Sequence, residues 1–250
     1  MSEVIPVELI QKLRSVQRVV VLTGAGTSAE SGVPTFREAQ TGLWARYDPK
    51  ELATPEAFQR NPRLVWEWYT WRRELSAQAQ PNPGHLALAQ MQTHVPQFTL
   101  ITQNVDGLHQ RAGPNQVIEL HGNITRTICA TNRHVVDSWA PTDEVPPLCP
   151  HCGGQLRPDV VWFGEALPEE ALRQAMIAVQ QSDLVFSIGT SNLVYPAASL
   201  PFEALEQGAT VIEINPNDTP LTPHVHFALT GQVGQILPIL VNLTWSSKPT

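Results

Sequence analysis

The sequence predicts an α/β protein built on a doubly wound parallel sheet. Short apolar, β-branched runs alternate with longer segments of helical periodicity, a pattern typical of buried parallel strands joined by helices. Each expected strand also leads into a loop rich in Gly, Asn, Ser, Thr or His, and ligands bind at the carboxyl ends of strands in such sheets. The expected strands are Val19–Thr23, Phe98–Thr102, Val117–His121, Leu184–Ile188 and Thr210–Asn215. The expected helices are Val7–Val16, Pro62–Ala79, His85–His94, Pro168–Ser182 and Ala197–Gln207.

Composition limits the class of protein further. The 250 residues, 42% of them hydrophobic, are enough for one large domain or for a large and a small one. The formal net charge of −7 argues against a general nucleic-acid or anionic-membrane partner. The sequence has no run of 18 apolar residues and no basic-then-apolar start, so we expect a cytoplasmic protein. Three cysteines are too few for a disulfide scaffold.

The first expected strand leads into a turn of the kind that cradles phosphates. Residues Gly24–Ala29 fit the pattern G-x-G-x-x-A of dinucleotide-binding folds. A dehydrogenase would continue with a helix and a second strand ending in Asp or Glu about 20 residues on, but prolines and a glycine interrupt this chain and no apolar strand appears. The long loop instead carries Phe36 and Arg37, which suits closure over a dinucleotide better than hydride transfer. Glu213 or Asn215 is left as a candidate to hold a ribose.

Three motifs together, GAGTSAESGVPTFR, TQNVDGLH and LHGN, resemble the sirtuins, the NAD-dependent protein lysine deacylases. The resemblance covers nearly the whole chain, because RPDVVWFGE, GTSNLVYPA and GQVGQILPIL also match in order. It implies a Rossmann-like large domain made of residues 1–34, 82–123 and 157–250, with a cofactor-loop and helical segment at 35–81 and a small zinc-ribbon-like insert at 124–156. It also implies NAD as the cofactor and acylated-lysine proteins or peptides as the partners.

The family mechanism gives roles to three residues. In sirtuins the acyl oxygen of the modified lysine attacks C1′ of the nicotinamide ribose, nicotinamide leaves, and a histidine takes a proton from a ribose hydroxyl. The products are free lysine, nicotinamide and O-acyl-ADP-ribose. The resemblance implies that His121 is this base, that Asn104 positions the ribose and a water, and that Asp106 contacts the nicotinamide carboxamide. An imidazole suits a base at neutral pH, although a core histidine and an Asx-turn are the structural alternatives.

The other implied contacts fall into two groups. Backbone glycines would approach the phosphates, Thr27 would add a hydroxyl, and Phe36 would shield C1′. The implied NAD-binding residues are Gly24, Ala25, Gly26, Thr27, Phe36, Arg37, Trp44, Gln103, Asn104, Asp106, Gly189, Thr190, Ser191, Asn215, Asn217 and Val233. The substrate peptide is expected to add as a strand along a second stretch, for which a buried strand edge is the alternative. This stretch comprises Val160, Trp162, Phe163, Gly164 and Glu165.

One expected helix suggests which acyl group is removed. Tyr69 and Arg72 are three residues apart and so share a helix face. A guanidinium binds a carboxylate bidentately, and a phenol adds a hydrogen bond. With the small Ala53 upstream, the pair resembles the class III sirtuins that remove acidic acyl groups, so we expect succinyl-, malonyl- and glutaryl-lysine as substrates, and acetyl-lysine as well. The alternative is an aromatic core stripe with Arg72 in solvent.

The expected metal module lacks one cysteine. Sirtuins usually carry two cysteine pairs that hold a structural zinc ion, and such a site needs four N or S ligands. Here Asn132 stands where the second cysteine of the first pair is expected, and an amide is a poor zinc ligand. The remaining candidate ligands are Cys129, Cys149 and Cys152. We expect either zinc with His134, His151 or water as the fourth ligand, or a module without metal.

Other functions stay open at this point. The same scaffold could act as an ADP-ribosyltransferase, with the same NAD cleavage and a different acceptor. It could also be an NAD-binding module without turnover, or an oxidoreductase, which the missing second strand disfavours. A zinc ribbon that reads nucleic acid is a further alternative, and the acidic balance counts against it.

Overall fold

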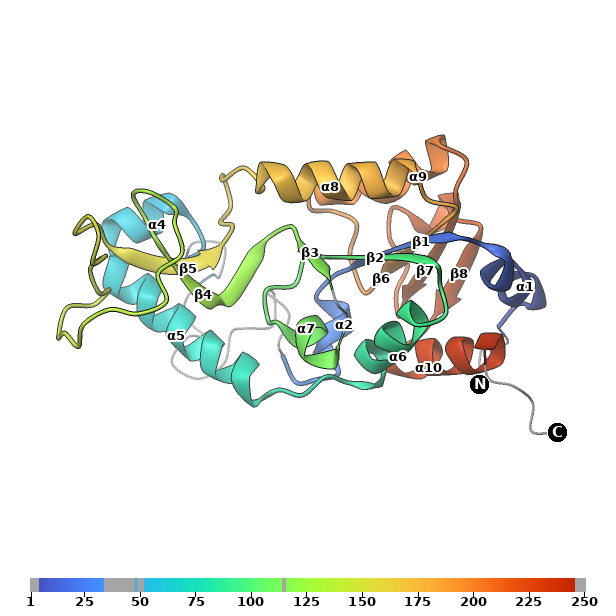
Figure 1. The fold of residues 1–250 in the computed structure, drawn as a ribbon, viewed down its shortest axis with the longest axis horizontal. Helices are drawn as coiled ribbons and strands as arrows, with labels where there is room; N and C mark the ends of the chain where they lie inside the picture. The colour runs from blue at the N-terminus through green and yellow to red at the C-terminus, as the bar shows by residue number, and fades with distance from the viewer. Residues whose placement is uncertain (1–4, 34–47, 49–51, 114–115, 246–250) are drawn as a thin grey trace.

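The predicted parallel sheet is present in the computed structural model, which describes residues 5–33, 48, 52–113 and 116–245 (Figure 1). Six strands pair in parallel in the order β3-β2-β1-β6-β7-β8. The strands are β1 (Arg18–Thr23), β2 (Gln97–Thr102), β3 (Val117–Glu119), β6 (Leu184–Ile188), β7 (Thr210–Asn215) and β8 (Phe227–Thr230). The chain builds outward from β1 to β3 and then crosses to β6 on the other side of β1. The boundary between β1 and β6 is therefore the topological switch point, where such sheets bind ligands.

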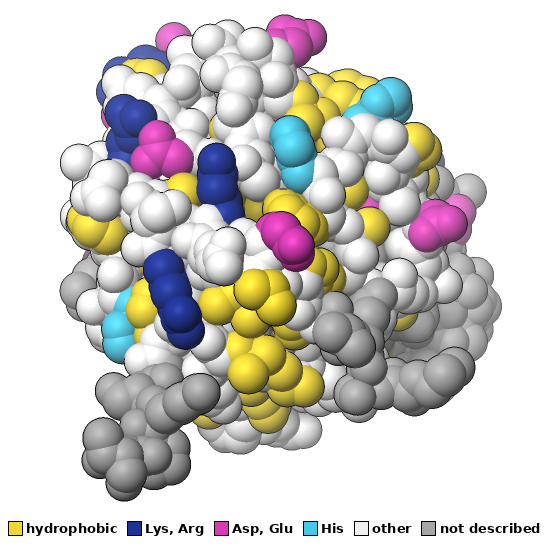
Figure 2. Space-filling view, turned by 90° about the vertical axis from the view of Figure 1, so that its right-hand side faces the viewer, with side chains coloured by type: hydrophobic (Ala, Val, Ile, Leu, Met, Phe, Trp, Pro, Cys, Tyr) yellow, Lys and Arg dark blue, Asp and Glu magenta, His cyan; other side chains and the backbone are white. Residues whose placement is uncertain are grey.

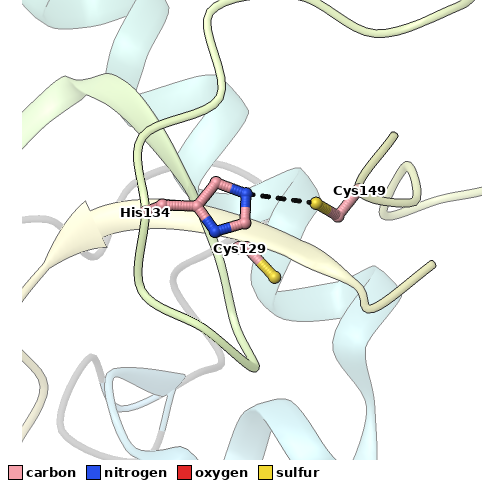
Figure 3. A group of neighbouring side chains, drawn as sticks. All are labelled: Cys129, His134 and Cys149. Carbon is pink, nitrogen blue, oxygen red and sulfur yellow. Dashed lines mark hydrogen bonds between the residues drawn. The ribbon is translucent and has the colours of Figure 1, made fainter. Parts of the chain in front are cut away.

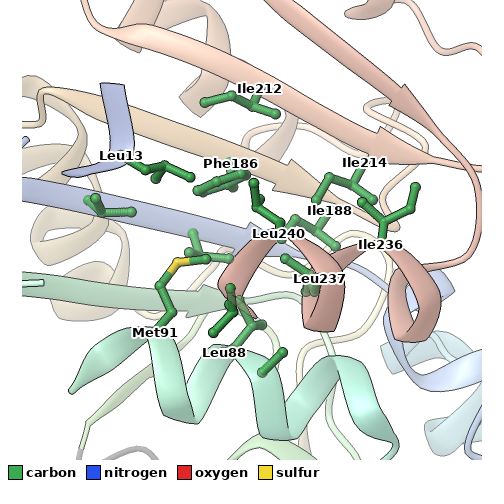
Figure 4. Close-up of a cluster of buried hydrophobic side chains, with 14 of the residues drawn as sticks. Leu13, Leu88, Met91, Phe186, Ile188, Ile212, Ile214, Ile236, Leu237 and Leu240 are labelled. Atoms are coloured by element: carbon green, nitrogen blue, oxygen red, sulfur yellow. The ribbon is translucent and has the colours of Figure 1, made fainter. Parts of the chain in front are cut away.

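Helices cover both faces of this sheet, as the alternating pattern predicts. The first face packs against α1 (Val7–Ser15), α6 (Pro83–Gln92) and α10 (Val233–Trp245). The second packs against α8 (Glu169–Gln180) and α9 (Leu200–Glu206), which follows the 3₁₀ turn η2 (Ala197–Ser199). Figure 4 shows the first core, in which side chains of α6 and α10 meet those of β6 and β7. The remaining short helices are α2 (Gly26–Ala29), α7 (Leu108–Ala112) and η3 (Thr222–His224).

A second, smaller unit comes from two long connections of the sheet. The β1–β2 connection supplies α4 (Pro55–Arg60) and α5 (Pro62–Gln78), and the β3–β6 connection supplies the antiparallel pair β4 (Gly122–Cys129) and β5 (Leu156–Val160). A shared apolar cluster joins them, with Trp68 and Tyr69 of α5 packed against the β4–β5 pair. This unit lies at one end of the molecule, on the left in Figure 1, beyond α2 and α7.

Three helices begin with the same local device. A Thr or Asn at the cap is followed by Pro at the first helical position, as in Thr54–Pro55, Asn61–Pro62 and Asn82–Pro83. Each cap side chain accepts a hydrogen bond from the first turn, and proline lacks the N–H that would otherwise be unsatisfied there. These three prolines therefore start helices rather than interrupt them.

The structure differs from the predicted elements in a few places. β3 ends at Glu119, two residues earlier than expected, so His121 lies in a turn rather than a strand. The predictions missed α10 because Pro238 lies inside it, and they missed β4 and β5 because polar residues and Pro158 break the apolar pattern. Apolar periodicity marks elements that pack on a large hydrophobic core. β4 and β5 pack on a small core, and α10 carries a proline, which is typical of a helix end.

The end of the molecule that α1 occupies carries mixed charges. Figure 2 shows this face, on which a few basic and a few acidic side chains are scattered among hydrophobic and other side chains. A continuous basic stripe, the usual electrostatic sign of a nucleic-acid partner, does not form among the described residues of this face. Of the helices that the structure describes, none is both long and apolar enough to cross a bilayer.

We predict that Gly189→Ala destabilises the protein far more than Gly208→Ala. Both glycines have positive φ, +60° and +80°, so both substitutions carry the left-handed penalty of about 1–2 kcal/mol. Only at Gly189 would the new Cβ also meet backbone, 2.4 Å from the Thr27 nitrogen, whereas nothing lies within 4 Å at Gly208. Denaturant unfolding of the two variants measures the difference, and equal losses would contradict the close approach.

Candidate active site at the switch point of the sheet

The phosphate turn lies directly against the backbone that follows β6. The Gly24 N–H donates to the Ile188 carbonyl at 3.0 Å, and the Gly26 N–H donates to the Gly189 carbonyl at 2.8 Å. A Cβ on Gly24 would lie 2.7 Å from the Thr190 side chain, and one on Gly26 would lie 2.7 Å from the Gly189 oxygen. The glycines therefore serve first to bring two loops together. The resulting edge, with α2 beginning at Gly26, has the form that holds a dinucleotide pyrophosphate.

His121 is held in a defined tautomer beside this edge. Its Nδ1 lies 3.0 Å from the Gln103 carbonyl oxygen. Since a carbonyl can only accept, Nδ1 carries the proton in the neutral ring and Nε2 keeps its lone pair. Burial lowers the pKa of His121, and the hydrogen bond to Gln103 partly opposes this. The neutral ring, able to accept a proton at Nε2, is thus the form present at neutral pH.

The TQNVDGLH segment places its polar side chains next to the phosphate turn. The Gln103 amide donates to the Thr190 hydroxyl at 3.1 Å, and the Asn104 amide donates to the Ser28 hydroxyl at 3.0 Å. Asp106 is buried and accepts from the Leu108 N–H at 2.9 Å, the Asx-turn expected as its structural alternative. Burial also raises the pKa of Asp106. Gln103, Asn104 and His121, which two different connections supply, are thus brought to one edge.

Behind Asn104 lies a buried polar network that sequence reasoning missed. The His85 ring accepts from the Asn82 N–H at Nδ1, so its Nε2 bears the proton and faces the Ser28 hydroxyl at 3.4 Å. His109 lies against His85, with ring centroids 4.7 Å apart, and its Nε2 is 2.9 Å from the Thr23 hydroxyl. The buried Nδ1 of His109 has no partner among the described residues. A histidine in PNPGH, three residues after a capping Asn, was the available signal.

Of the other residues predicted to contact NAD, some lie at the sheet edge and others do not. The Thr27 hydroxyl is buried and lies 3.2 Å from the Ile188 carbonyl, so it braces the turn instead of facing the edge, contrary to expectation. Asn215 donates to the Thr190 carbonyl at 2.8 Å, and Ser191 is exposed. Ala25 lies in the turn, Asn217 is exposed, and Val233 is buried at the start of α10. Phe36, Arg37 and Trp44 lie outside the described residues.

The alternative ribose ligand, Glu213, has a structural role instead. Its carboxylate is buried and accepts hydrogen bonds from three side chains of the surrounding loops. These donors are Asn192, Thr219 and Thr222. A carboxylate held in this way fixes the loops after β6 and β7 rather than reaching a ligand.

The predicted acyl clamp lies in the small unit. Tyr69 is buried, its oxygen accepts a hydrogen bond from the Trp162 indole at 3.0 Å, and burial raises its pKa to about 12. Arg72 lies over the Trp68 ring, 5.1 Å from the centroid. Burial lowers the pKa of Arg72, and the charges of Tyr69 and Asp106 oppose that shift. Arg72 is therefore partly buried, with its guanidinium on the Trp68 ring instead of extending freely into solvent. Ala53 is buried in the same cluster.

The predicted peptide-binding stretch begins as strand and continues as a turn. β5 ends at the buried Val160, whereas Phe163 is exposed and Gly164 has a φ of +88°. The Phe163 N–H donates to the Ala53 carbonyl at 2.9 Å, which fastens the turn to the α4 side of the small unit. The stretch is therefore partly a strand edge, its expected alternative, and partly an exposed turn.

A buried ion pair holds this turn. Arg157 binds Glu165 with its two terminal nitrogens, Nη1 at 2.6 Å and Nη2 at 2.9 Å, and its guanidinium carbon lies 3.2 Å from the centroid of the Trp162 ring. Glu165 also accepts from the Trp162 N–H at 2.8 Å and from Arg133 at 3.2 Å. The Trp162 indole, which bonds to Tyr69, is thus held on one ring face by the Arg157 cation. The Trp162 backbone N–H is held by the Glu165 carboxylate.

Three metal-ligating side chains converge at the far end of the small unit (Figure 3). The donor atoms of Cys129, His134 and Cys149 all lie within 4.8 Å of one another. The sulfur of Cys152 lies 3.4 Å from that of Cys129, while Asn132 is exposed. The chain therefore gathers three thiols and one imidazole, a donor set that suits zinc.

We predict that the protein loses stability as the pH falls from 7 to 5. Burial holds the pKa of His85 at about 4 and that of His109 at about 3, below the unfolded value of 6.5. The unfolded chain therefore takes up protons in this range that the folded chain does not, which costs roughly 4 kcal/mol for the pair. Denaturant unfolding at pH 7, 6 and 5 measures the loss. His109→Gln should reduce it by about half, the exposed His224→Gln should not, and a pH-independent stability would refute the prediction.

Comparison with known proteins agrees with this geometry. Residues 24–196 match the model of the Sir2 family. The chain is 55% identical to an NAD-dependent protein deacylase of Aquifex aeolicus over 86% of this chain and 91% of that one. It is 54% identical to NAD-dependent protein deacylase 2 of Pyrobaculum aerophilum, over 92% of each chain. A solved complex of a Sir2 homologue with NAD superposes with a TM-score of 0.90 at 45% identity, covering 97% of this chain and 94% of that one. This chain therefore belongs to the Sir2 family.

Proposed function

We propose that this protein is an NAD-dependent protein lysine deacylase and that His121 is its general base. The arrangement of His121 carries the proposal, because its Nδ1 is tied to the Gln103 carbonyl and its Nε2 keeps a lone pair beside the dinucleotide edge. The curated relatives above are NAD-dependent protein deacylases. In another Sir2 structure, 32% identical with a TM-score of 0.79 and covering 94% of this chain and 96% of that one, a deacetylated p53 peptide is bound with 3′-O-acetyl ADP ribose.

We assign the residues around His121 separate roles in binding and orienting NAD. With NAD bound, C1′ of its nicotinamide ribose would be the carbon that the acyl oxygen of the modified lysine attacks, with nicotinamide as the leaving group. His121 accepts the proton of a ribose hydroxyl at Nε2, Asn104 orients the ribose, and Asp106 holds the nicotinamide amide. Ser28 fixes Asn104 through their 3.0 Å hydrogen bond and is itself held by the buried His85. Gly24 and Gly26 let the phosphate turn pack against the backbone that follows β6, which shapes the edge where the phosphates would bind.

The first experiment measures nicotinamide release and peptide mass with NAD and matched succinyl-lysine and acetyl-lysine peptides. We predict turnover of both peptides, with the higher kcat/KM for succinyl. His121→Ala should still bind NAD but lose turnover by about 100-fold or more, since a positioned base contributes about 10²–10⁴-fold. ADP-ribose attached to protein without any need for an acylated lysine would favour a transferase instead. NAD binding without turnover of either peptide would overturn the proposal.

The preference for acidic acyl groups rests on Tyr69 and Arg72. A pKa of about 12 keeps the Tyr69 phenol protonated, and its oxygen already accepts from Trp162, so its own proton is the group it can offer. Burial destabilises the cation of Arg72, and a carboxylate at the end of the acyl chain would offset that cost. We infer that succinyl, malonyl and glutaryl groups place their carboxylate between these two side chains. Acetyl groups reach the same edge without this interaction.

We predict that Arg72→Met lowers kcat/KM for the succinyl peptide by about 10- to 100-fold, since a charge-assisted hydrogen bond contributes about 1.5–3 kcal/mol. The acetyl peptide should be affected several-fold less. The neighbouring Arg73 is a matched control, because its Nε donates to the Ile124 carbonyl at 2.8 Å on the side of β4. Arg73→Met should leave the ratio of the two activities unchanged. Equal loss with both peptides in Arg72→Met would refute the carboxylate clamp.

We also propose that the thiols of Cys129, Cys149 and Cys152 hold a structural zinc ion. The apolar cluster around them is small, consisting of Val136 and Leu156 with two partly buried tryptophans. A domain with so small a core usually needs a metal or a disulfide to be stable. The ion would join the end of β4 to the segment that precedes β5.

A further inference from the structure

The cysteine missing from the metal module has a replacement that the chain sequence alone does not identify. A closed zinc site needs four ligands, and bond lengths of about 2.0–2.3 Å in a tetrahedron put ligand atoms about 3.4–3.8 Å apart. The His134 Nε2 lies 3.4 Å from the Cys149 sulfur, and the Cys129 and Cys152 sulfurs are also 3.4 Å apart. Two edges of the tetrahedron are therefore already at ligand spacing.

The backbone explains why His134, and not Asn132, faces the thiols. The chain turns back after β4, with the Cys129 N–H donating to the His134 carbonyl at 3.0 Å. Ile128 bridges to Val135 in the same antiparallel register, so Cys129 and His134 lie opposite each other. Residues directly opposite in an antiparallel pair project their side chains to the same face. His134 is therefore on the cysteine face.

The geometry of the turn directs Asn132 away from the thiols. The Arg133 N–H closes the turn on the Cys129 carbonyl at 2.9 Å, and Arg133 adopts a left-handed φ of +61°. Asn132 is consequently exposed at the tip of the turn. In the sequence, Asn132 interrupts the expected Cys-x-x-Cys pattern. In the structure, the left-handed Arg133 reverses the chain, so that His134 lies where the fourth ligand is needed.

His151 is the other imidazole near the module, and its position is different. It lies between Cys149 and Cys152 in sequence, is exposed, and packs edge-on against the His134 ring with centroids 5.2 Å apart. Among the described residues, the donor atoms that all lie within 4.8 Å of one another are those of Cys129, His134 and Cys149, and Cys152 joins this group through its sulfur, 3.4 Å from that of Cys129. His134 Nε2 lies 3.4 Å from the Cys149 sulfur, whereas the contact of His151 is with the His134 ring. His151 thus covers the outside of the imidazole that faces the thiols.

We propose that His134 is the fourth zinc ligand, which makes the module a Cys₃His site formed by Cys129, His134, Cys149 and Cys152. The proposal rests on the structural zinc ion proposed above. It makes His134 Nε2 the ligand atom, with the ring held from behind by His151. Because Arg133 binds Glu165 at 3.2 Å, the ligand turn is also joined to the turn that carries Trp162.

The test compares metal binding in the full-length protein and three variants. Zinc content of the purified wild type should be one ion per chain. His134→Ala should lower zinc affinity, measured by competition with a chromogenic chelator, by more than the roughly 10- to 100-fold that changes behind a ligand cost. His151→Ala should stay within that range, and His134→Cys should retain zinc, because it supplies a fourth thiolate.

Each other outcome has a distinct meaning. A wild type without zinc would refute the structural zinc itself. Loss of zinc in His151→Ala with retention in His134→Ala would assign the ligand to His151, and full affinity in both would leave the fourth corner to water. If His134→Ala does not fold, absorption of the cobalt-loaded wild type and His134→Cys decides. Thiolate-to-cobalt intensity should rise in His134→Cys with the added thiolate, and an unchanged spectrum would overturn the assignment.

Discussion

The backbone of the phosphate turn lies against the backbone that follows β6, and the positions of the other site residues depend on this contact. Gly24 and Gly26 donate to consecutive carbonyls at the end of β6, where a Cβ on either glycine or on Gly189 would overlap protein atoms. Gln103 and Asn215 then bond to Thr190, the residue that follows Gly189. Loops from four strands are thereby fixed at one edge, because hydrogen bonds between backbones leave little freedom for the side chains that follow.

Trp162 connects the small unit to the residues of the proposed acyl-binding site. Trp162 bonds to Tyr69 through its indole, stacks on the buried Arg157, and has its backbone held by Glu165. Burying an ion pair brings no large gain in stability, since desolvation offsets most of the attraction. An ion pair with two hydrogen bonds does define orientation, and here it sets the direction of the indole ring that bonds to Tyr69 of the proposed acyl clamp. Arg133 also binds Glu165, which joins this ion pair to the turn that carries the proposed zinc ligand His134.

Much of the fold and site could be predicted because strong local signals coincide with their tertiary roles. The five expected strands and the helices on both faces are present, since apolar periodicity reports burial directly. The motif residues Gln103, Asn104 and His121 lie at the expected sheet edge, because the carboxyl ends of parallel strands meet there. The buried pair of His85 and His109 was not found. The capping Asn82 could have indicated the local role of His85, but its contact with His109 joins two segments far apart in the chain, which local spacing does not encode.

The sequence by itself determined the family, the parallel sheet, the NAD edge and the identity of the candidate base, because each depends on residue types at fixed short spacings. Only the tertiary structure decided how side chains from different connections meet. In the tertiary structure the Thr27 hydroxyl faces the Ile188 carbonyl, and the Glu213 carboxylate accepts hydrogen bonds from neighbouring loops. His134 lies opposite Cys129. These outcomes depend on a strand register, a left-handed turn and contacts between segments far apart in the chain, and spacing along one segment does not encode them.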